Sequence, residues 1–238
     1  MSPQRRLERT YREFKRRALP TRVADSGWLV GPDLIHIHDD YLKSKHKIAI
    51  IGQQVHGWYY DFPEFLREWP ISEAVKEYTR FDYAHDKREP ECLRTPFWKF
   101  FHDIRRAAYG DDAESHCTVL WTNAIKFVTK RGSDSVIWEG FSRAEPAIRI
   151  QGELLLTELR IARPKVCIFV TGPDFDFLLE RYFPGLQRRR VARFKEHVLA
   201  RLVHPALPLR SFRTYHPQYL VRRGLRSKVF NALCRELW

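Results

Sequence analysis

Four short segments of this 238-residue chain follow apolar runs and carry side chains that can do chemistry. They are GQQVHG at 52–57, TNAIK at 122–126, TGPD at 171–174 and TYHPQY at 214–219. His216, fixed beside a proline, can donate a hydrogen bond to a developing negative charge. The Asn123 amide carries a donor and an acceptor, so it can test the polar edge of a ring. Gln54 can orient a water through its carbonyl oxygen.

The elements that must position these segments alternate between strands and helices. Apolar runs predict strands at 47–52, 116–122, 165–171 and 207–215, and helical patterns cover 63–78, 96–108, 146–162, 174–183 and 224–237. The first three strands are apolar throughout, which is typical of strands covered on both faces. This alternation predicts an α/β fold with three layers (α/β/α) around a central, mainly parallel, four-stranded sheet. Because ligands bind beyond the carboxyl ends of such strands, the four segments are expected to converge on one site.

A basic helix is predicted to precede this domain. Residues 1–22 are expected to form a basic N-terminal helix region, in which an arginine-rich helix at 4–18 is stopped by Pro20. Residues 23–238 are expected to form a single α/β domain, with an irregular stretch at 23–46. The chain is 44% hydrophobic, which is enough for one substantial core.

The charge of the chain favours a polyanionic partner. The formal net charge is +13, and the cations cluster at 5–17, at 188–193 and on both sides of His216. Clustered Lys and Arg neutralise phosphates, so the binding affinity should fall steeply with salt. No apolar run is long enough to span a membrane, and the N-terminus lacks the apolar part of a secretory signal. We therefore expect a cytoplasmic protein that does not bind membranes.

Other classes of site fit the sequence poorly. Gly52 and Gly57 have the spacing of a phosphate-binding loop, but Trp58 stands where the loop needs a lysine. The HIHDD segment at 36–40 has no matching downstream ligands, which favours a solvated segment over a metal site. The four cysteines form no Cys-x-x-Cys pair and are expected to be reduced. We expect no metal and no other cofactor.

Taken together, the segments resemble the uracil-DNA glycosylase superfamily. The similarity is carried by IIGQQVHGW, LWTNAIKF, IFVTGPDFD and RTYHPQYL, which come in the family's order and cover most of residues 47–238. It implies a uracil-DNA glycosylase-like fold. It also implies a hydrolase that flips a damaged or modified, pyrimidine-type base out of DNA and cleaves its N-glycosidic bond, leaving an abasic site. Such base excision serves DNA repair, and some superfamily members remove modified bases from phage DNA in antiviral defence.

The resemblance implies roles for individual residues. Gly52 and Gln53 would form the water-activating loop, Asn123 would bind the base edge, and His216 would donate to the carbonyl oxygen of the leaving base. Phe97 can stack on the base, although a core position is the more frequent use of such spacing. The residues expected to contact DNA are Lys126, Arg213, Pro217, Gln218, Tyr219, Arg222 and Arg223.

Three features depart from the family's pattern. Gln54 stands where the best-known members carry Asp; it can orient water but cannot accept a proton. Asp61 is an alternative carboxylate, unless it is an N-cap or turn residue before Pro63. Tyr59 is assigned to base binding because aromatic bulk in this loop suggests a different or larger base. Tyr219 replaces a smaller residue and is either a wedge in the DNA stack or a packing residue under the C-terminal helix.

Several alternatives therefore stay open at this point. Asn123 can instead satisfy backbone groups at a strand end, and His216 can be a buried, hydrogen-bonded histidine. Lys126 can face solvent rather than a phosphate. The second candidate function is a non-catalytic DNA-binding module that keeps the glycosylase fold, and Gln54 is its best support. In either case we expect a monomer whose partner is DNA.

Overall fold

The computed structural model describes residues 1–19, 29–54, 60–79, 95–110, 116–129 and 141–238. Internal contacts divide the chain into two compact units. The first unit comprises Met1–Ile37, Gln54–Phe81 and Thr122–Ala162, and the second comprises His38–Gln53, Asp82–Trp121 and Arg163–Trp238. No helix in the described ranges combines the length and the apolar character needed to cross a membrane.

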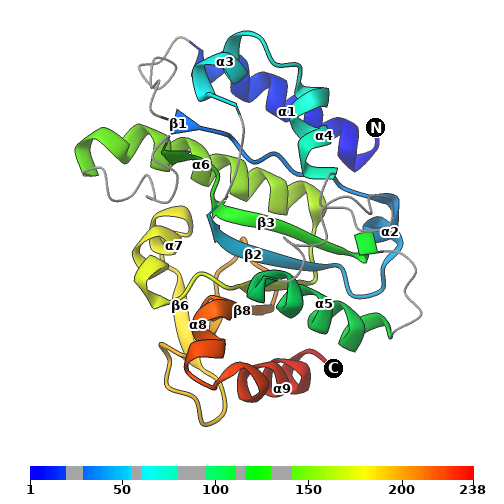
Figure 1. The fold of residues 1–238 in the computed structure, drawn as a ribbon, viewed down its shortest axis with the longest axis vertical. Helices are drawn as coiled ribbons and strands as arrows, with labels where there is room; N and C mark the ends of the chain where they lie inside the picture. Colours follow the sequence, from blue (N-terminus) through cyan, green and yellow to red (C-terminus); the bar gives the residue numbers. More distant parts are fainter. Residues whose placement is uncertain (20–28, 55–59, 80–94, 111–115, 130–140) are drawn as a thin grey trace. The chain divides into compact units, whose positions relative to one another are not determined.

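The first unit is mainly helical (Figure 1). Its helices are α1 (Pro3–Ala18), α3 (Phe62–Arg67), α4 (Ile71–Thr79) and α6 (Phe141–Ala162), and its two short antiparallel strands are β1 (Leu29–Val30) and β4 (Val128–Thr129). The N-terminal helix α1 contacts α3, α4 and α6.

Helix α1 is fixed by one buried stripe of side chains. Ser2 caps the helix by accepting the N–H of Arg5, and Pro3 occupies the first turn, where a missing N–H costs nothing. Apolar residues then recur every three or four positions, and all of them are buried: Leu7, Tyr11, Phe14 and Ala18. The arginines of α1 are consequently held on the outer side of a helix that belongs to the core of the first unit.

The second unit is built around a mixed sheet of six strands in the order β3-β2-β5-β8-β7-β6. The strands are β2 (Ile48–Gln54), β3 (Val119–Ile125), β5 (Val166–Phe169), β6 (Gln187–Arg190), β7 (Leu199–Val203) and β8 (Arg210–Thr214). Gln54 and Thr122–Ile125, the last residues of β2 and β3, are grouped with the first unit. Strand β5 pairs in parallel with both β2 and β8, whereas β7 pairs antiparallel with β8 and with β6.

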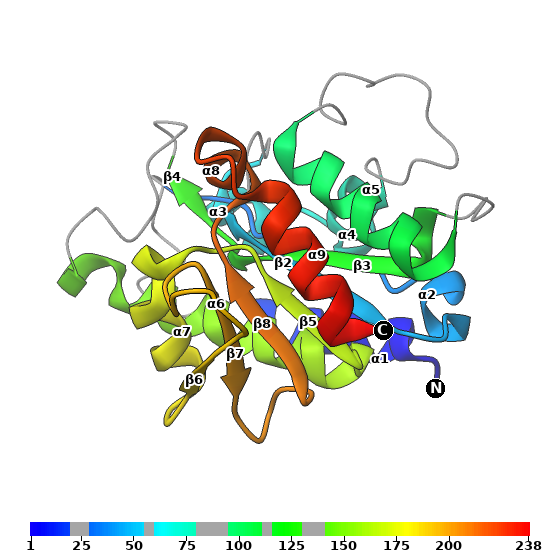
Figure 2. The same cartoon turned by 90° about the horizontal axis from the view of Figure 1, so that it is seen from below.

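The helices of the second unit are α2 (Asp39–Lys43), α5 (Pro96–Tyr109), α7 (Asp176–Tyr182), α8 (Pro217–Arg222) and α9 (Arg226–Leu237). Short 3₁₀ turns cover His116–Thr118 and Pro173–Phe175. Helix α9 contacts β8, α5 and α8, and its buried side chains are Val229, Ala232, Leu233 and Leu237. Figure 2 shows α9 beside β8.

The predicted α/β class is confirmed, but the sheet is larger than predicted. The four predicted strands are neighbours in the order β3-β2-β5-β8. The two further strands form a hairpin with antiparallel pairing, and the sheet is therefore mixed. Strand β6 has the sequence QRRR, which carries no apolar signal because most of its side chains face solvent.

Several element boundaries also differ from the prediction. The helix predicted at 63–78 is two helices, because Pro70 disfavours a helical conformation at Trp69. The stretch predicted to be irregular at 23–46 contains β1 and α2. The strand predicted at 116–122 runs from Val119 to Ile125 and is buried throughout, so Asn123 lies within a strand rather than after it.

Candidate functional site

In the second unit, the parallel strands β2, β5 and β8 bring three predicted segments together at their carboxyl ends. The Nε2 of Gln53 donates to the backbone oxygen of Thr171, with 2.7 Å between the two atoms. The backbone N–H of Gly172 donates to the oxygen of Thr214 at 2.9 Å. Gly172 has φ +78°, and a Cβ there would lie 3.5 Å from the Tyr215 ring. Hydrogen bonds therefore join the ends of the three strands, and Gln53, Thr171, Gly172 and Tyr215 lie together at this edge of the sheet.

His216 follows Tyr215 directly and caps α8. Its Nδ1 accepts the backbone N–H of Gln218 at 3.3 Å, and burial lowers the pKa of His216 to about 4. The imidazole is therefore neutral near pH 7. Because Nδ1 is the acceptor, the single ring proton must sit on Nε2. His216 thus presents a neutral N–H donor with a fixed tautomer at the end of β8.

An aromatic ring lies beside this donor. The Phe97 ring is nearly parallel to the His216 ring, with an interplanar angle of 13° and 6.4 Å between the ring centroids. Phe97 stands in the first turn of α5, and the Trp98 ring lies edge-on to it with 5.0 Å between the ring centroids. Phe97 is only half-buried. The residue predicted to stack on a base and the residue predicted to donate to it are therefore neighbours within the second unit.

Pro217, Gln218 and Tyr219, which are expected to contact DNA, lie in a helix. Helix α8 begins at Pro217 because His216 provides the cap and proline suits the first helical position. The Tyr219 ring lies 4.3 Å from the Tyr215 ring, and its hydroxyl accepts from Arg223 at 2.9 Å. Tyr219 is half-buried on Tyr215, while three other polar residues of this segment are exposed: Gln218, Arg222 and Arg223.

Three residues predicted to contact DNA are instead buried: Pro217 at the start of α8, and the two cations Lys126 and Arg213. Arg213 is 1% exposed and donates to the His197 backbone oxygen at 2.8 Å and to Asp176 at 2.9 Å. Lys126 is 0% exposed, and its Nζ lies 2.6 Å from Glu158. Both cations lie in or next to strands that are covered by protein, so each is paired internally with a carboxylate rather than with a phosphate.

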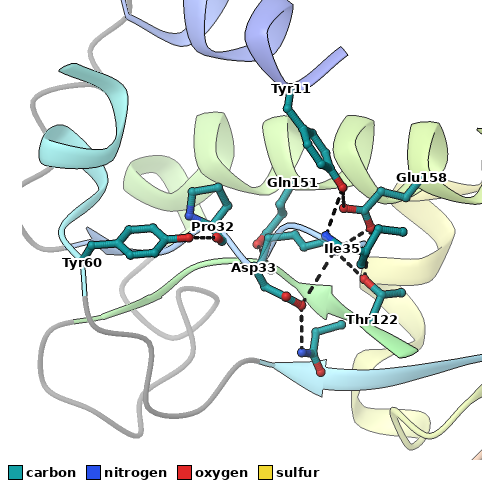
Figure 3. Close-up of polar contacts among 10 residues, drawn as sticks. Tyr11, Pro32, Asp33, Ile35, Tyr60, Thr122, Gln151 and Glu158 are labelled. Atoms are coloured by element: carbon teal, nitrogen blue, oxygen red, sulfur yellow. Dashed lines mark hydrogen bonds and ion pairs between the residues drawn. The ribbon is translucent and has the colours of Figure 1, made fainter. Parts of the chain in front are cut away.

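Figure 3 shows a buried polar cluster in the first unit with Tyr11, Asp33, Thr122 and Glu158. Lys126 pairs with both carboxyls of this cluster. Its Nζ lies 2.6 Å from Glu158 and 3.9 Å from Asp33, and all three side chains are fully buried. Thr122 and Tyr11 both donate to Glu158, at 3.0 and 2.8 Å. Burial raises the pKa of Asp33 and of Glu158, and the ammonium of Lys126 opposes both shifts. The cluster therefore holds two carboxyls with one cation in a dry environment.

Asn123 is oriented by this cluster. Its Nδ2 donates to Asp33 Oδ2 at 3.1 Å, and the residue is 6% exposed. Because a carboxylate can only accept a hydrogen bond, the NH₂ group of Asn123 must face Asp33. The Oδ1 atom of the planar amide then points away from Asp33. The partner found is a side chain, not the strand-end backbone.

Sequence reasoning missed the carboxyls that organise this cluster. Asp33 falls in the stretch predicted to be irregular at 23–46, and Glu158 lies in the run LLLTELRIA. The available signal was Glu158 itself, because it follows Leu154 and Leu155 by four and three positions and so shares their buried face. A carboxyl on a buried helix face needs a cation or several donors, although the sequence does not say which.

The remaining predicted residues have the following positions. Gly52 is buried within β2, and Gln54 is the half-buried last residue of that strand. Asp61 occupies the N-cap position of α3 without capping it through its side chain, and its backbone bridges Val30. Tyr59 lies outside the described residues. Gln54, Asp61 and Asn123 belong to the first unit, whereas Gly52, Gln53 and His216 belong to the second.

Comparison with known proteins adds no functional assignment. No protein-family model matches this chain, and no curated protein matches its sequence. Within the described residues, no group of three or more His, Cys, Asp and Glu side chains is arranged to hold a metal ion. The motifs and the geometry within each unit therefore remain as the indications of function.

Proposed function

We propose that this protein is a DNA glycosylase that flips out a damaged or modified pyrimidine-type base and hydrolyses its N-glycosidic bond, in repair or in defence against phage DNA. The observation that carries the proposal is the neutral Nε2–H donor of His216 beside the half-buried Phe97 ring. The four motifs that resemble uracil-DNA glycosylases provide the second support.

The chemistry of the reaction suits a donor of this kind. When the glycosidic bond breaks, negative charge grows on the departing base, and one well-placed donor in a preformed site contributes about 3–4 kcal/mol. His216 keeps the same protonation state at any pH well above its pKa of about 4. An aromatic face beside the donor gives an extruded base a surface for stacking. Phe97 offers that face.

The amide groups would take the two other tasks. Gln53 donates to Thr171 through Nε2, which leaves its Oε1 as an acceptor for a water or a ligand at the strand edge. The Asn123 amide is oriented by Asp33. The role of Asn123 in binding the base and that of Gln54 in positioning water are taken from the resemblance and remain predictions.

A cationic surface follows the donor along the chain. Arg222 and Arg223 are exposed at the end of α8, one to two helical turns from His216. Exposed arginines can replace counterions on a phosphate backbone. With Lys126, Arg213 and Pro217 buried, the remaining candidates for DNA contacts among the predicted residues are these two arginines, Gln218 and the half-buried Tyr219.

The proposal is tested with single-turnover assays. Folded protein in excess is incubated with oligonucleotides that contain uracil, other deaminated bases or bulky modified cytosines, and abasic sites are then cleaved with alkali. His216→Ala should slow cleavage about 10²–10³-fold. His204→Ala is a matched control, because His204 also accepts a backbone N–H two residues later through Nδ1, at 3.1 Å, but does not follow a strand end of the parallel set. It should keep the wild-type rate.

Two results would oppose the proposal. Strand cleavage on none of the substrates would refute the activity, and equal rates for wild type and His216→Ala would refute the role of His216. A non-catalytic DNA-binding module is the second candidate, favoured by Gln54 in place of a carboxylate. It predicts salt-dependent binding of DNA without any abasic product, so the same assay separates the two candidates.

A further inference from the structure

A pocket of about 390 Å³ opens in the first unit between α1 and the start of α4. Arg12, Lys15 and Arg16 line it from α1, and Trp69 lines it from the turn before α4. Leu66 adds apolar surface, and none of the described residues that line the pocket is acidic. The pocket therefore combines an apolar wall and an indole with three cations.

The three cations of the pocket have N–H groups that can still donate to a ligand. Arg16 is exposed and makes no ion pair within the described part of the chain. Arg12 pairs with Glu8 at 3.5 Å, but its side chain is 61% exposed, and such surface pairs contribute little and exchange easily. Lys15 donates to the backbone oxygen of Trp69 at 2.6 Å, which uses one of its three N–H groups.

The pocket lies at the end of a row of arginines. Four exposed residues of α1 recur with helical spacing on one face: Arg5, Arg9, Arg12 and Arg16. At about 1.5 Å per residue the row is about 16 Å long. The backbone that carries these arginines is held in place, because the opposite face of α1 is buried in the core of the first unit. A row of this length suits a chain of phosphates better than a single small anion.

We propose that this row and its pocket, together called the α1 surface, bind single-stranded DNA, with phosphates along the arginines and one base in the pocket against Trp69. Proteins that bind single strands combine a cationic track for the backbone with aromatic side chains for the bases, and the α1 surface has both. Duplex DNA offers the same phosphates but keeps its bases stacked, so it cannot use the pocket. This binding site involves none of the residues assigned to glycosylase chemistry and does not require that activity.

The test is fluorescence anisotropy of the full chain with a labelled oligothymidylate of about 12 nucleotides over a range of salt concentrations. Arg12→Gln/Arg16→Gln should weaken binding at least tenfold at low salt and reduce the slope of log K against log salt by about 1.4, or about 0.7 for each phosphate that is no longer neutralised. The matched control is Arg6→Gln/Arg17→Gln, which removes the same charge from exposed positions on another face of α1. It should change the affinity less than about threefold.

A second pair of variants tests the pocket. Trp69→Leu should weaken binding about five- to a hundredfold with the salt slope unchanged, and Trp69→Tyr should restore much of it, because stacking needs an aromatic face. Circular dichroism checks that each variant is folded. The proposal is overturned if the two arginine pairs lose affinity equally, if duplex DNA of the same length binds as tightly as the single strand, or if single-stranded RNA binds more tightly than DNA.

Discussion

Lys126→Met removes the cation from the buried cluster of the first unit and leaves its carboxyls in place. In the wild type, the ammonium of Lys126 lies 2.6 Å from Glu158 and 3.9 Å from Asp33, and none of the three side chains is exposed. Methionine fills a similar volume without charge. The change therefore isolates the effect of the ion pairs from the effect of packing.

The expected loss of stability is large. Breaking a buried ion pair by removing one partner costs about 3–5 kcal/mol, because the other charge stays buried without compensation. With an m-value of about 3 kcal/mol/M, the urea midpoint should fall by about 1–1.7 M. Lys76→Met is the surface control: its side chain is 72% exposed and its pair with Glu73 is 3.6 Å long. It should change the free energy of unfolding by less than about 1 kcal/mol.

The pH dependence of the loss has a definite sign. Burial raises the pKa of Asp33 and of Glu158, and Lys126 lowers both. Without Lys126 the folded-state pKa values rise further above their unfolded values of about 4. A group with a raised folded pKa binds more protons in the folded state, so stability is kept below the unfolded pKa and lost as pH rises through the folded pKa. The deficit of Lys126→Met should therefore be larger near pH 8 than near pH 5.

The assay is urea unfolding followed by circular dichroism at both pH values. Adding Glu158→Gln to Lys126→Met should recover part of the lost stability, since glutamine removes the uncompensated charge and can still bond to Tyr11 and Thr122. The reasoning is refuted if Lys126→Met is as stable as the wild type. It would also fail if this variant instead reduced the salt slope of DNA binding by the amount expected for one phosphate, because Lys126 would then be on the surface.

The other predictions concern the second unit. Arg213→Met should lower the free energy of unfolding, measured in urea, by about 3 kcal/mol. This is near the lower end of the cost of breaking a buried ion pair, because Asp176 still has Arg188 at 3.6 Å. A loss below about 1 kcal/mol would contradict the burial of Arg213. Gly172→Ala should cost about 1–2 kcal/mol through its φ of +78°, since the new Cβ makes only ordinary contact at 3.5 Å, and a cost near zero would argue against that backbone conformation. The imidazole of His216 should titrate near pH 4 by NMR, and a titration near 6.5 would contradict its burial. The free energy of unfolding should fall as the pH drops from about 6.5 toward 4, because the unfolded chain takes up the proton first.

The regular elements of the central sheet were predictable because their signals are local. The apolar runs at 47–52 and 165–171 are strands β2 and β5, and the basic helix at 4–18 is α1. The spacing of apolar residues over a short segment is enough to indicate a fully buried strand or a helix with one buried face. The hairpin β6–β7 was missed for the same reason, since QRRR is paired through its backbone and carries no such pattern.

The candidate site was only partly predictable, because residue types do not fix the direction of a side chain. The sequence indicated that His216 precedes a proline and that Phe97 opens α5, but it gave no sign that the two rings lie side by side. Lys126 and Arg213 were predicted to contact DNA, but in the structure each pairs with a carboxylate. Long cationic side chains have enough rotatable bonds to turn inward when a carboxylate is near.

By itself, the sequence determined the α/β class, the parallel strands β2, β5 and β8, and the strongly cationic character of the chain. These follow from hydrophobic period and net charge, which need no knowledge of distant contacts. Only the tertiary structure decided which cations are exposed and which are paired, that Asp33 orients Asn123, and which nitrogen of His216 carries the proton. Each of these depends on a partner remote in sequence or on a single hydrogen bond, and only the folded backbone can bring such groups within bonding distance.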